Sequence, residues 1–268
     1  MKRDGHRKHR RRGLFIALAI IGVTGLMVWQ LPVFRLISID VPELRSLDRQ
    51  PVVDASGLSI GQHLFQGLGG NLEQIVQLRY PLAEMKLLAA FPTIKTVKAR
   101  LIFPGKISLA IEERVEVAYV SFPDGCVMID KEGVALKIWQ DAPQGIPIIE
   151  GVSATSLILG KPLEVDVPSA MNSAITLMGA IIEADKDTRA AITLLPQIRT
   201  IRPLNGSRLY LMVVLPKTGE ELTVLAETGQ NQTEDMLWLR FALAQDSFDG
   251  RGKGVLDLTG SRRTFTPD

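Results

Sequence analysis

The stretch that decides the fold runs from Phe91 to Val120 and reads FPTIKTVKARLIFPGKISLAIEERVEVAYV. Apolar and polar residues alternate on both sides of the pair Pro104-Gly105. Because successive side chains of a β-strand point to opposite faces, this alternation indicates two strands that each bury one face. The Pro-Gly pair is typical of a turn. We therefore predict a β-hairpin with an apolar inner face and a polar outer face.

The alternation also predicts which residues of the hairpin lie opposite each other. If Phe103 pairs with Ile107 across a loop over residues 104–106, the remaining pairs are Leu101 with Leu109, Ala99 with Ile111 and Lys98 with Glu112. A slip of one residue would turn the apolar set of one strand toward water, so the buried face specifies the register.

The segments before the hairpin predict one more strand and helices. A strand is expected over Phe34–Val41, followed by a short helix with Ser46 as its N-cap and Gly57 as its stop. Residues 71–90 have apolar side chains at helical spacing, with a break or kink at Pro81. The order strand, helix, helix, strand, strand predicts a small α+β module with its helices on one face of the sheet.

The segments after the hairpin predict a second, β-rich domain with two helices. Turn signals at Asp124-Gly125 and Glu132-Gly133 separate short strands. Amphipathic spacing predicts a helix over 169–185, and a second helix is expected to begin at Thr233 as its N-cap. A final strand is predicted over 254–259. We place the module boundary near Arg114–Val117 and interpret residues 260–268 as a tail.

The N-terminus carries a basic arm and an uncharged apolar run. Residues 1–13 hold seven Lys or Arg against one acid, whereas the rest of the chain has 24 basic and 28 acidic residues. Residues 14–31, LFIALAIIGVTGLMVWQL, contain no charge, and eighteen helical residues span roughly 27 Å, close to the thickness of a membrane core. Since positive charge stays in the cytoplasm, we predict a single transmembrane helix with the N-terminus inside.

A cleaved signal peptide is the alternative interpretation of this segment. Its apolar region would be shorter and would end in small residues before the cleavage site. The end of the run here reads MVWQLPVF and offers no such pair, which favours an uncleaved anchor. A mildly acidic body behind a basic arm also argues against a nucleic-acid-binding protein.

Few residues of the chain carry catalytic chemistry. Gly57–Gly61 formally matches a G-x-S-x-G nucleophile motif around Ser59, but a helix is predicted before it and only His63 follows. The single cysteine, Cys126, rules out an intramolecular disulfide and is interpreted as a small apolar strand residue. We therefore predict no catalytic residue, no metal site and no cofactor.

Several motifs, taken in order, resemble the FtsQ/DivIB family of bacterial cell-division proteins. These are IGQHLF (60–65), the hairpin stretch with Phe103-Pro104 and Glu113-Arg114, CVMIDKEGVAL (126–136), IPIIEG (146–151) and GVLDLTGSRR (254–263). The resemblance implies an α+β fold: a cytoplasmic arm (1–13), one transmembrane helix (14–31), a POTRA-type module (33–115), a β domain (116–259) and a C-terminal tail (260–268).

The resemblance also implies a function and a binding site. It implies a non-enzymatic scaffold at the division septum, outside the cytoplasmic membrane, that binds single-pass division proteins of the FtsB/DivIC and FtsL types and helps recruit or regulate septal peptidoglycan synthesis. Partner binding is expected at the edge of the last strand of the β domain and at the helix before it, through Val255, Leu256, Asp257, Leu258, Trp238 and Phe241. The alternative for the two aromatic residues is ordinary core packing.

Two other functions fit parts of the sequence. A POTRA-bearing protein of envelope secretion or assembly would share the first module, although that class needs several such modules or a long series of membrane strands. A membrane-anchored hydrolase would use Ser59 as its nucleophile.

Overall fold

The computed structural model describes residues 31–122, 125–141, 145–204, 206–251, 253–260 and 262–267, together with Ile20 and Gly22. The predicted basic arm and almost all of the predicted transmembrane helix lie outside these residues. Within the described part, no helix is long and apolar enough to cross a membrane. The chain divides into two compact units, one formed by the described residues up to Ala90 with Ile94–Glu113, and the other by Phe91–Thr93 with Arg114 onward. The predicted limits at residues 33, 115 and 259 stay a prediction.

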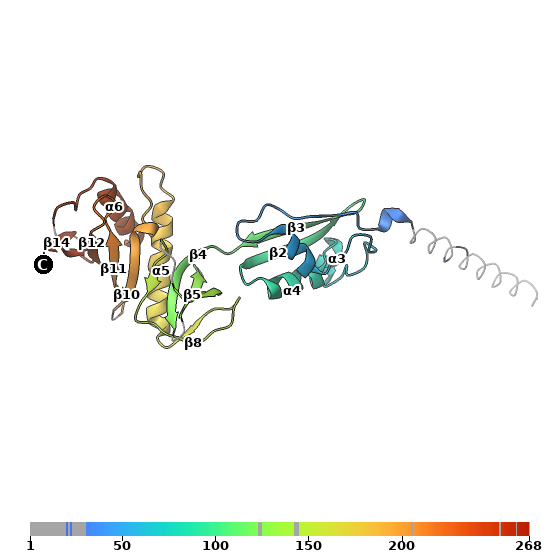
Figure 1. Cartoon of the computed structure of the whole chain (residues 1–268), viewed down its shortest axis with the longest axis horizontal. Helices are drawn as coiled ribbons and strands as arrows, with labels where there is room; N and C mark the ends of the chain where they lie inside the picture. The colour runs from blue at the N-terminus through green and yellow to red at the C-terminus, as the bar shows by residue number, and fades with distance from the viewer. Residues whose placement is uncertain are drawn as a thin grey trace, which may run out of the picture. The chain divides into compact units, whose positions relative to one another are not determined.

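Unit 1 is a three-stranded sheet with helices packed against it (Figure 1). The strand order is β1-β3-β2, with β1 parallel to β3 and β2 antiparallel to β3. Its elements are η1 (Pro32–Phe34), β1 (Ser38–Asp40), α2 (Arg49–Ser56), α3 (Leu72–Val76), α4 (Pro81–Ala90), β2 (Ile94–Ile102) and β3 (Lys106–Glu113).

The helices of unit 1 form where the sequence predicts them, but one cap differs. Gly57 ends α2 in the left-handed conformation (φ 69°), and Pro81 begins α4, so the predicted break is present. The prediction of Ser46 as the N-cap is wrong, because α2 begins after Asp48. The Ser46 hydroxyl instead donates to the carboxylate of Glu113. Burial of this carboxylate would raise its pKa, yet the hydrogen bonds that it receives leave the pKa below its usual value.

The hairpin of unit 1 has the predicted faces and a different register. Leu101 pairs with Ile107, Ala99 with Leu109, Val97 with Ile111 and Thr96 with Glu112. The predicted pairing of Phe103 with Ile107 is therefore wrong by two residues. Phe103 lies in the turn between β2 and β3, and it is half exposed. A shift of two residues keeps the same side chains on the buried face, so Leu101, Ile107 and Leu109 are all in the core.

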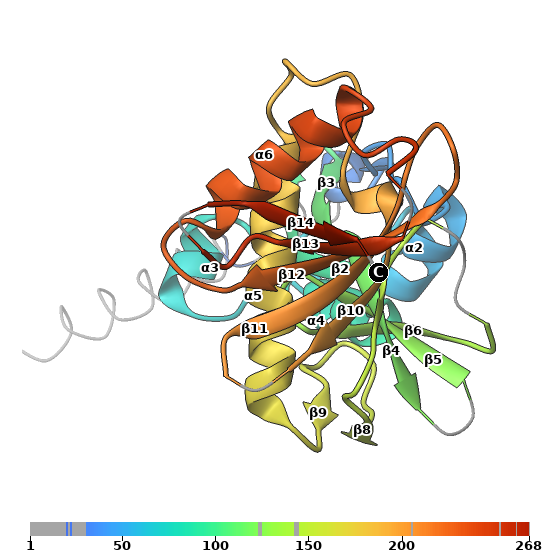
Figure 2. The same cartoon turned by 90° about the vertical axis from the view of Figure 1, so that its left-hand side faces the viewer.

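Unit 2 is built on a nine-stranded sheet with the order β14-β13-β12-β11-β10-β7-β4-β5-β6, and a separate two-stranded sheet is formed by β8 and β9. Figure 2 shows β10 to β14 side by side. The strands are β4 (Glu116–Phe122), β5 (Gly125–Asp130), β6 (Ala135–Trp139), β7 (Ile148–Ile149), β8 (Ala154–Ser156), β9 (Glu164–Val165), β10 (Ile198–Pro203), β11 (Arg208–Val214), β12 (Glu221–Glu227), β13 (Gly254–Asp257) and β14 (Thr264–Pro267).

The helices of unit 2 supply the other half of its main core. They are α5 (Pro168–Asp185), α6 (Gln232–Ala244) and the short η2 (Leu195–Gln197). Leu177 and Ile181 of α5 and Leu239 of α6 are completely buried in one cluster with the central strands. The prediction of Thr233 as the N-cap of α6 is wrong, because Thr233 lies inside the helix and Asn231 holds the cap position. The two helices therefore bury their apolar faces as predicted, although their first residues differ.

The C-terminal residues do not form a simple tail. Thr264–Pro267 form β14, which pairs antiparallel with β13 and is the last strand of the sheet in that direction. The prediction that β13 is the edge strand is therefore wrong. Alternating Thr and Phe in TFTP suit a half-exposed strand, and β13 supplies the neighbour that such a short strand needs.

One ion pair fixes the turn between β5 and β6 in unit 2. The Asp130 carboxylate accepts hydrogen bonds from the backbone N–H groups of Glu132 (2.8 Å) and Val134 (2.9 Å), and Arg114 Nη1 lies 2.5 Å from its other oxygen. Gly133 has φ +74°, and a Cβ there would lie 2.9 Å from an atom of Ile175. The Asp-Lys-Glu-Gly sequence is thus the turn between β5 and β6.

Candidate functional site

The C-terminal edge of the nine-stranded sheet is where the sequence places the binding site. β13 runs parallel to β12, with Val224 opposite Leu256 and Leu225 opposite Asp257. On its other side β13 pairs with β14, with Leu256 opposite Phe265. Both backbone edges of β13 are therefore occupied, and the outer side of β14 forms the open edge.

Side chains from α6 and from the C-terminal segment meet at this edge. The Arg263 guanidinium lies 4.9 Å from the centre of the Trp238 ring, and its Nη2 is 2.9 Å from Asp235 Oδ1. Phe248 contacts Trp238 edge-on, with ring centres 6.5 Å apart, and Phe265 at 6.3 Å. We call Asp235, Trp238, Phe248, Arg263 and Phe265 the terminal cluster. It fastens β14 to α6 through one ion pair, one cation–π contact and two ring contacts.

The six residues predicted to bind a partner fall into different environments. Leu256 and Leu258 are buried in the main core, at 2% and 3% exposure. Val255 and Asp257 alternate with them and are half buried. Asp257 accepts hydrogen bonds from the backbone and hydroxyl of Thr259, both at 2.8 Å.

The two predicted aromatic anchors make different contacts. Trp238 belongs to the terminal cluster and also packs against the main core. Phe241 is half buried. The centre of its ring lies 5.8 Å from the guanidinium carbon of Arg189, a residue that follows α5. Sequence reasoning missed Arg263, Phe265 and Phe248 as parts of this site. The signal available for the first two was the alternation Arg-Thr-Phe-Thr at the end of the chain.

A shallow depression of about 560 Å³ lies beside the terminal cluster. Its walls include Glu227, Gln230, Asp235, Thr259 and Arg263. These walls are mostly polar, and the depression is open to solvent. Pockets for small organic ligands are enclosed and mainly apolar, so this depression suits exposed polar contacts better than a small-molecule substrate.

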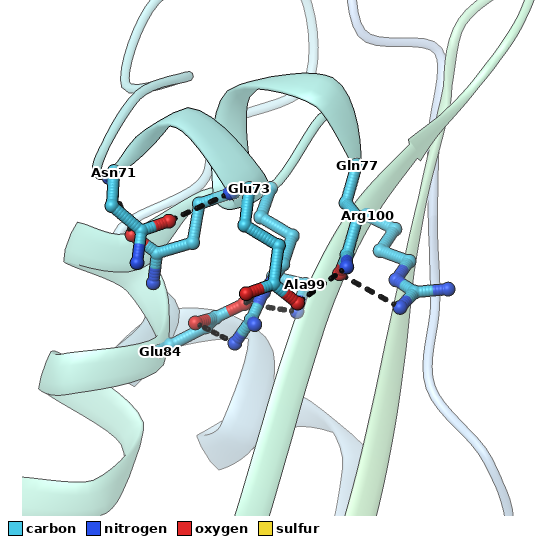
Figure 3. A network of polar contacts seen from close by, with 8 residues as sticks. Asn71, Glu73, Gln77, Glu84, Ala99 and Arg100 are labelled. Atoms are coloured by element: carbon cyan, nitrogen blue, oxygen red, sulfur yellow. Dashed lines mark hydrogen bonds and ion pairs between the residues drawn. The ribbon is translucent and has the colours of Figure 1, made fainter.

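Unit 1 contains a second cluster of polar side chains, drawn in Figure 3. Glu84 is 5% exposed and accepts two hydrogen bonds from Arg79, at 2.8 and 2.6 Å, and one from the backbone N–H of Ala99 at 2.9 Å. The hydrogen bond to Glu84 raises the pKa of Arg79. A fork-shaped pair of this kind is strong and geometrically specific. It fixes α4 on β2 and leaves neither charge available for catalysis.

α3 is joined to the same strand by neutral and charged contacts on the surface. Arg100 Nη2 donates to Gln77 Oε1 (3.0 Å), and Gln77 Nε2 donates to Glu73 Oε1 (2.9 Å) (Figure 3). Asn71 and Gln74 form a reciprocal capping box at the start of α3. These contacts hold a five-residue helix that would be marginal alone.

The described residues do not assemble a catalytic group around Ser59. Ser59 follows α2 and its left-handed Gly57, and no helix begins directly after it, whereas a nucleophile elbow needs a strand before the serine and a helix after it. Burial raises the pKa of the Cys126 thiol and so disfavours the reactive thiolate. Within the part of the chain that the structure describes, no cluster of three His, Cys, Asp or Glu side chains could hold a metal ion.

The fold and the terminal edge define a class: a mixed α+β protein of two compact units, in which side-chain contacts hold the last strand of the larger sheet. No family model matches the chain. FtsQ, a cell division protein of Corynebacterium glutamicum, is 22% identical over 122 residues, which cover 44% of this chain and 48% of that protein. FtsQ of Mycobacterium leprae is 27% identical over 126 residues, 47% of this chain and 33% of that protein.

The matched region thus spans half or less of the length of these curated relatives. Among solved structures, the extracytoplasmic domain of the trans isomer of DivIB from Geobacillus stearothermophilus covers 51% of this chain and 97% of that domain, with 17% identity and a TM-score of 0.30. The chain is thus similar to curated FtsQ cell division proteins over part of its length.

Proposed function

We propose that the chain is a non-enzymatic, single-pass component of the bacterial division machinery. Two curated relatives are cell division proteins, which supports the division role. The basic arm and the uncharged run over 14–31 support an anchor in the cytoplasmic membrane with the remainder outside. In this proposal, 33–115 is a POTRA-type module and 116–259 a β domain that binds division proteins of the FtsB/DivIC and FtsL types and helps recruit or regulate septal peptidoglycan synthesis.

We further propose that a partner binds by adding a strand beside β13 in the place of β14. The observation that carries this proposal is the pairing of β13 with a four-residue strand at the end of the chain. Such a strand has few ladder hydrogen bonds to lose, and backbone pairing can supply affinity to an incoming peptide. The side chains of Val255 and Asp257 would then contact the partner, while Leu256 and Leu258 stay in the core. Trp238 and Phe241 are the proposed aromatic anchors.

The division role is tested by localisation in living cells. A fluorescent fusion made at the native level should gather at midcell in dividing cells, and depletion of the protein should give filaments. A fusion that labels the whole envelope evenly during division would contradict the role.

The binding arrangement is tested by truncation after Thr259 in the full chain. Removing β14 takes away an intramolecular competitor, whose effective concentration is in the millimolar range for a short linker, so affinity for FtsB/DivIC- and FtsL-type proteins should rise about tenfold or more. Arg199→Ala, an exposed position in the same sheet, is the control and should leave affinity unchanged. Weaker binding after truncation would instead place the partner on the outer side of β14.

A further inference from the structure

Exposed apolar side chains gather at one end of unit 1. Ile60 is 72% exposed, Ile37 62% and Phe103 52%, and Leu31 and Val33 are also exposed. We call these five residues the span-proximal face, because the predicted transmembrane helix ends at Leu31. Single exposed apolar residues are common on protein surfaces, but a contiguous group marks a contact with another apolar phase.

The backbone contacts show that the segments carrying these residues lie side by side. The N–H groups of Ile37 and Ser38 donate to the carbonyl of Gly105, at 2.7 and 3.2 Å, so the Ile37 segment lies beside the turn that contains Phe103. A Cβ on Gly105 would lie 2.8 Å from an atom of the Ile37 side chain. Figure 1 shows η1 next to the turn between β2 and β3.

The loop that carries Ile60 lies against the same segment. The N–H of Gly61 donates to the carbonyl of Leu36 (2.7 Å), and the N–H of Leu36 donates to the carbonyl of Gln62 (2.8 Å). Arg35 Nη1 donates to the carbonyl of Gly61 (3.2 Å), which places a guanidinium among the apolar side chains. The face therefore joins apolar groups with one exposed cation, a combination that suits the boundary between lipid head groups and acyl chains.

We propose that the span-proximal face rests on the outer surface of the bilayer that holds the chain's own transmembrane helix. The proposal rests on the single span of the proposed function. Arg35 is four Cα steps from Leu31, so it lies at most about 14 Å from the end of the span. At that reach Ile37, Ile60 and Phe103 can enter the interfacial layer, and Arg35 can contact a lipid phosphate.

The test uses the full chain, one copy per nanodisc of phosphatidylcholine and phosphatidylglycerol, with an environment-sensitive fluorophore on a single added cysteine. Native Cys126 is buried, and the unsubstituted chain measures its background labelling. Ile60→Cys and Val33→Cys report the face. Leu88→Cys is the control, because Leu88 is also exposed but lies in the last turn of α4, near the start of β2. Nine strand residues put the two ends of β2 about 26 Å apart.

Lipids that carry a nitroxide near the head group should quench the labels at Ile60 and Val33 about twofold or more and leave the Leu88 label unchanged. Adding Phe103→Asp should restore most of the fluorescence at Ile60. Equal quenching at all three positions, or none at Ile60 and Val33 in a chain that co-elutes with nanodiscs, would overturn this inference and leave the proposed function intact. A chain that does not co-elute with nanodiscs would overturn the single span and this inference together. Protection of Ile60 from aqueous iodide without lipid quenching would indicate a protein contact, which also overturns it.

Discussion

The buried pair of Arg79 and Glu84 should carry much of the stability of unit 1. In Glu84→Leu, the guanidinium of Arg79 loses two hydrogen bonds and the carboxylate that it pairs with, and the N–H of Ala99 loses its acceptor. Breaking a buried pair costs about 3–5 kcal/mol. The Arg79 side chain keeps 17% exposure, so partial hydration favours the lower limit, about 3 kcal/mol.

Hydrogen exchange of the full chain is the suitable assay, because it reports each unit separately and needs no two-state unfolding. A loss of about 3 kcal/mol corresponds to exchange roughly 100-fold faster for the amides of α4 and β2 that exchange through opening of unit 1. Glu73→Gln is the matched control, since Glu73 is exposed and accepts one surface hydrogen bond. Its effect should stay within about 0.5 kcal/mol.

A double variant separates the charge pair from the packing around it. Arg79→Met combined with Glu84→Leu removes both charges and should recover most of the lost protection, because apolar replacements of a whole buried pair are often neutral. If Glu84→Leu accelerates exchange no more than Glu73→Gln does, the pair does not stabilise α4 on β2, and the reasoning is refuted.

Three further outcomes are expected. Tyr80→Phe should destabilise unit 1 by about 1 kcal/mol, because the Tyr80 hydroxyl donates to the carbonyl of Leu64, whereas Tyr119→Phe should be neutral or stabilising, because this buried hydroxyl has no partner. Calorimetry compares the stability of the two variants, and an equal loss of stability in both would contradict the difference in hydrogen bonding between Tyr80 and Tyr119. Burial raises the pKa of Tyr80 to about 12, so its contribution is complete below pH 10 and is lost as the pH rises through 12. Burial also raises the pKa of Tyr119 to about 12, so in an ultraviolet titration of tyrosinate Tyr80→Phe should reduce the step near pH 12 and leave the part due to Tyr119. Arg263→Ala should speed amide exchange in β14 but change global stability by less than about 1 kcal/mol, because the contact with Trp238 is partly exposed; unchanged exchange would show that the cation does not hold β14.

The hairpin shows what alternation can and cannot predict. Alternation correctly places Leu101, Ile107 and Leu109 on the buried face, because a slip of one residue would expose them. It cannot distinguish registers that differ by two residues, since both bury the same set. The turn makes that choice: Phe103 joins Pro104 and Gly105 between the strands. Side-chain patterns therefore give the face of a strand, whereas the backbone geometry of the turn gives its partner residues.

The helices show the same contrast as the hairpin: the local sequence pattern predicts the helix body, whereas a residue far away in the sequence can decide where the helix begins. Apolar spacing predicts the bodies of α4, α5 and α6, because burial of one face decides them. It fails at Ser46, which has the right chemistry for an N-cap but donates instead to Glu113, 67 residues away. A potential cap residue such as Ser46 can accept from a helix N–H or donate to another group, and only the folded chain determines which partner is near.

The predicted binding residues of the last strand fall on two different faces once the pleat of β13 is known. Leu256 and Leu258 point into the core, so a partner could not contact their side chains without unfolding the sheet, whereas Val255 and Asp257 lie on the other face. A substitution such as Leu256→Pro would therefore remove a core side chain and a backbone donor together and could not isolate binding. The sequence could nominate the strand because GVLDLT has strand composition, but it gave no sign that TFTP, after a loop, pairs with it. Strand pairing between short segments depends on neighbours that no local pattern contains, which is why the occupied edge could be found only in the structure.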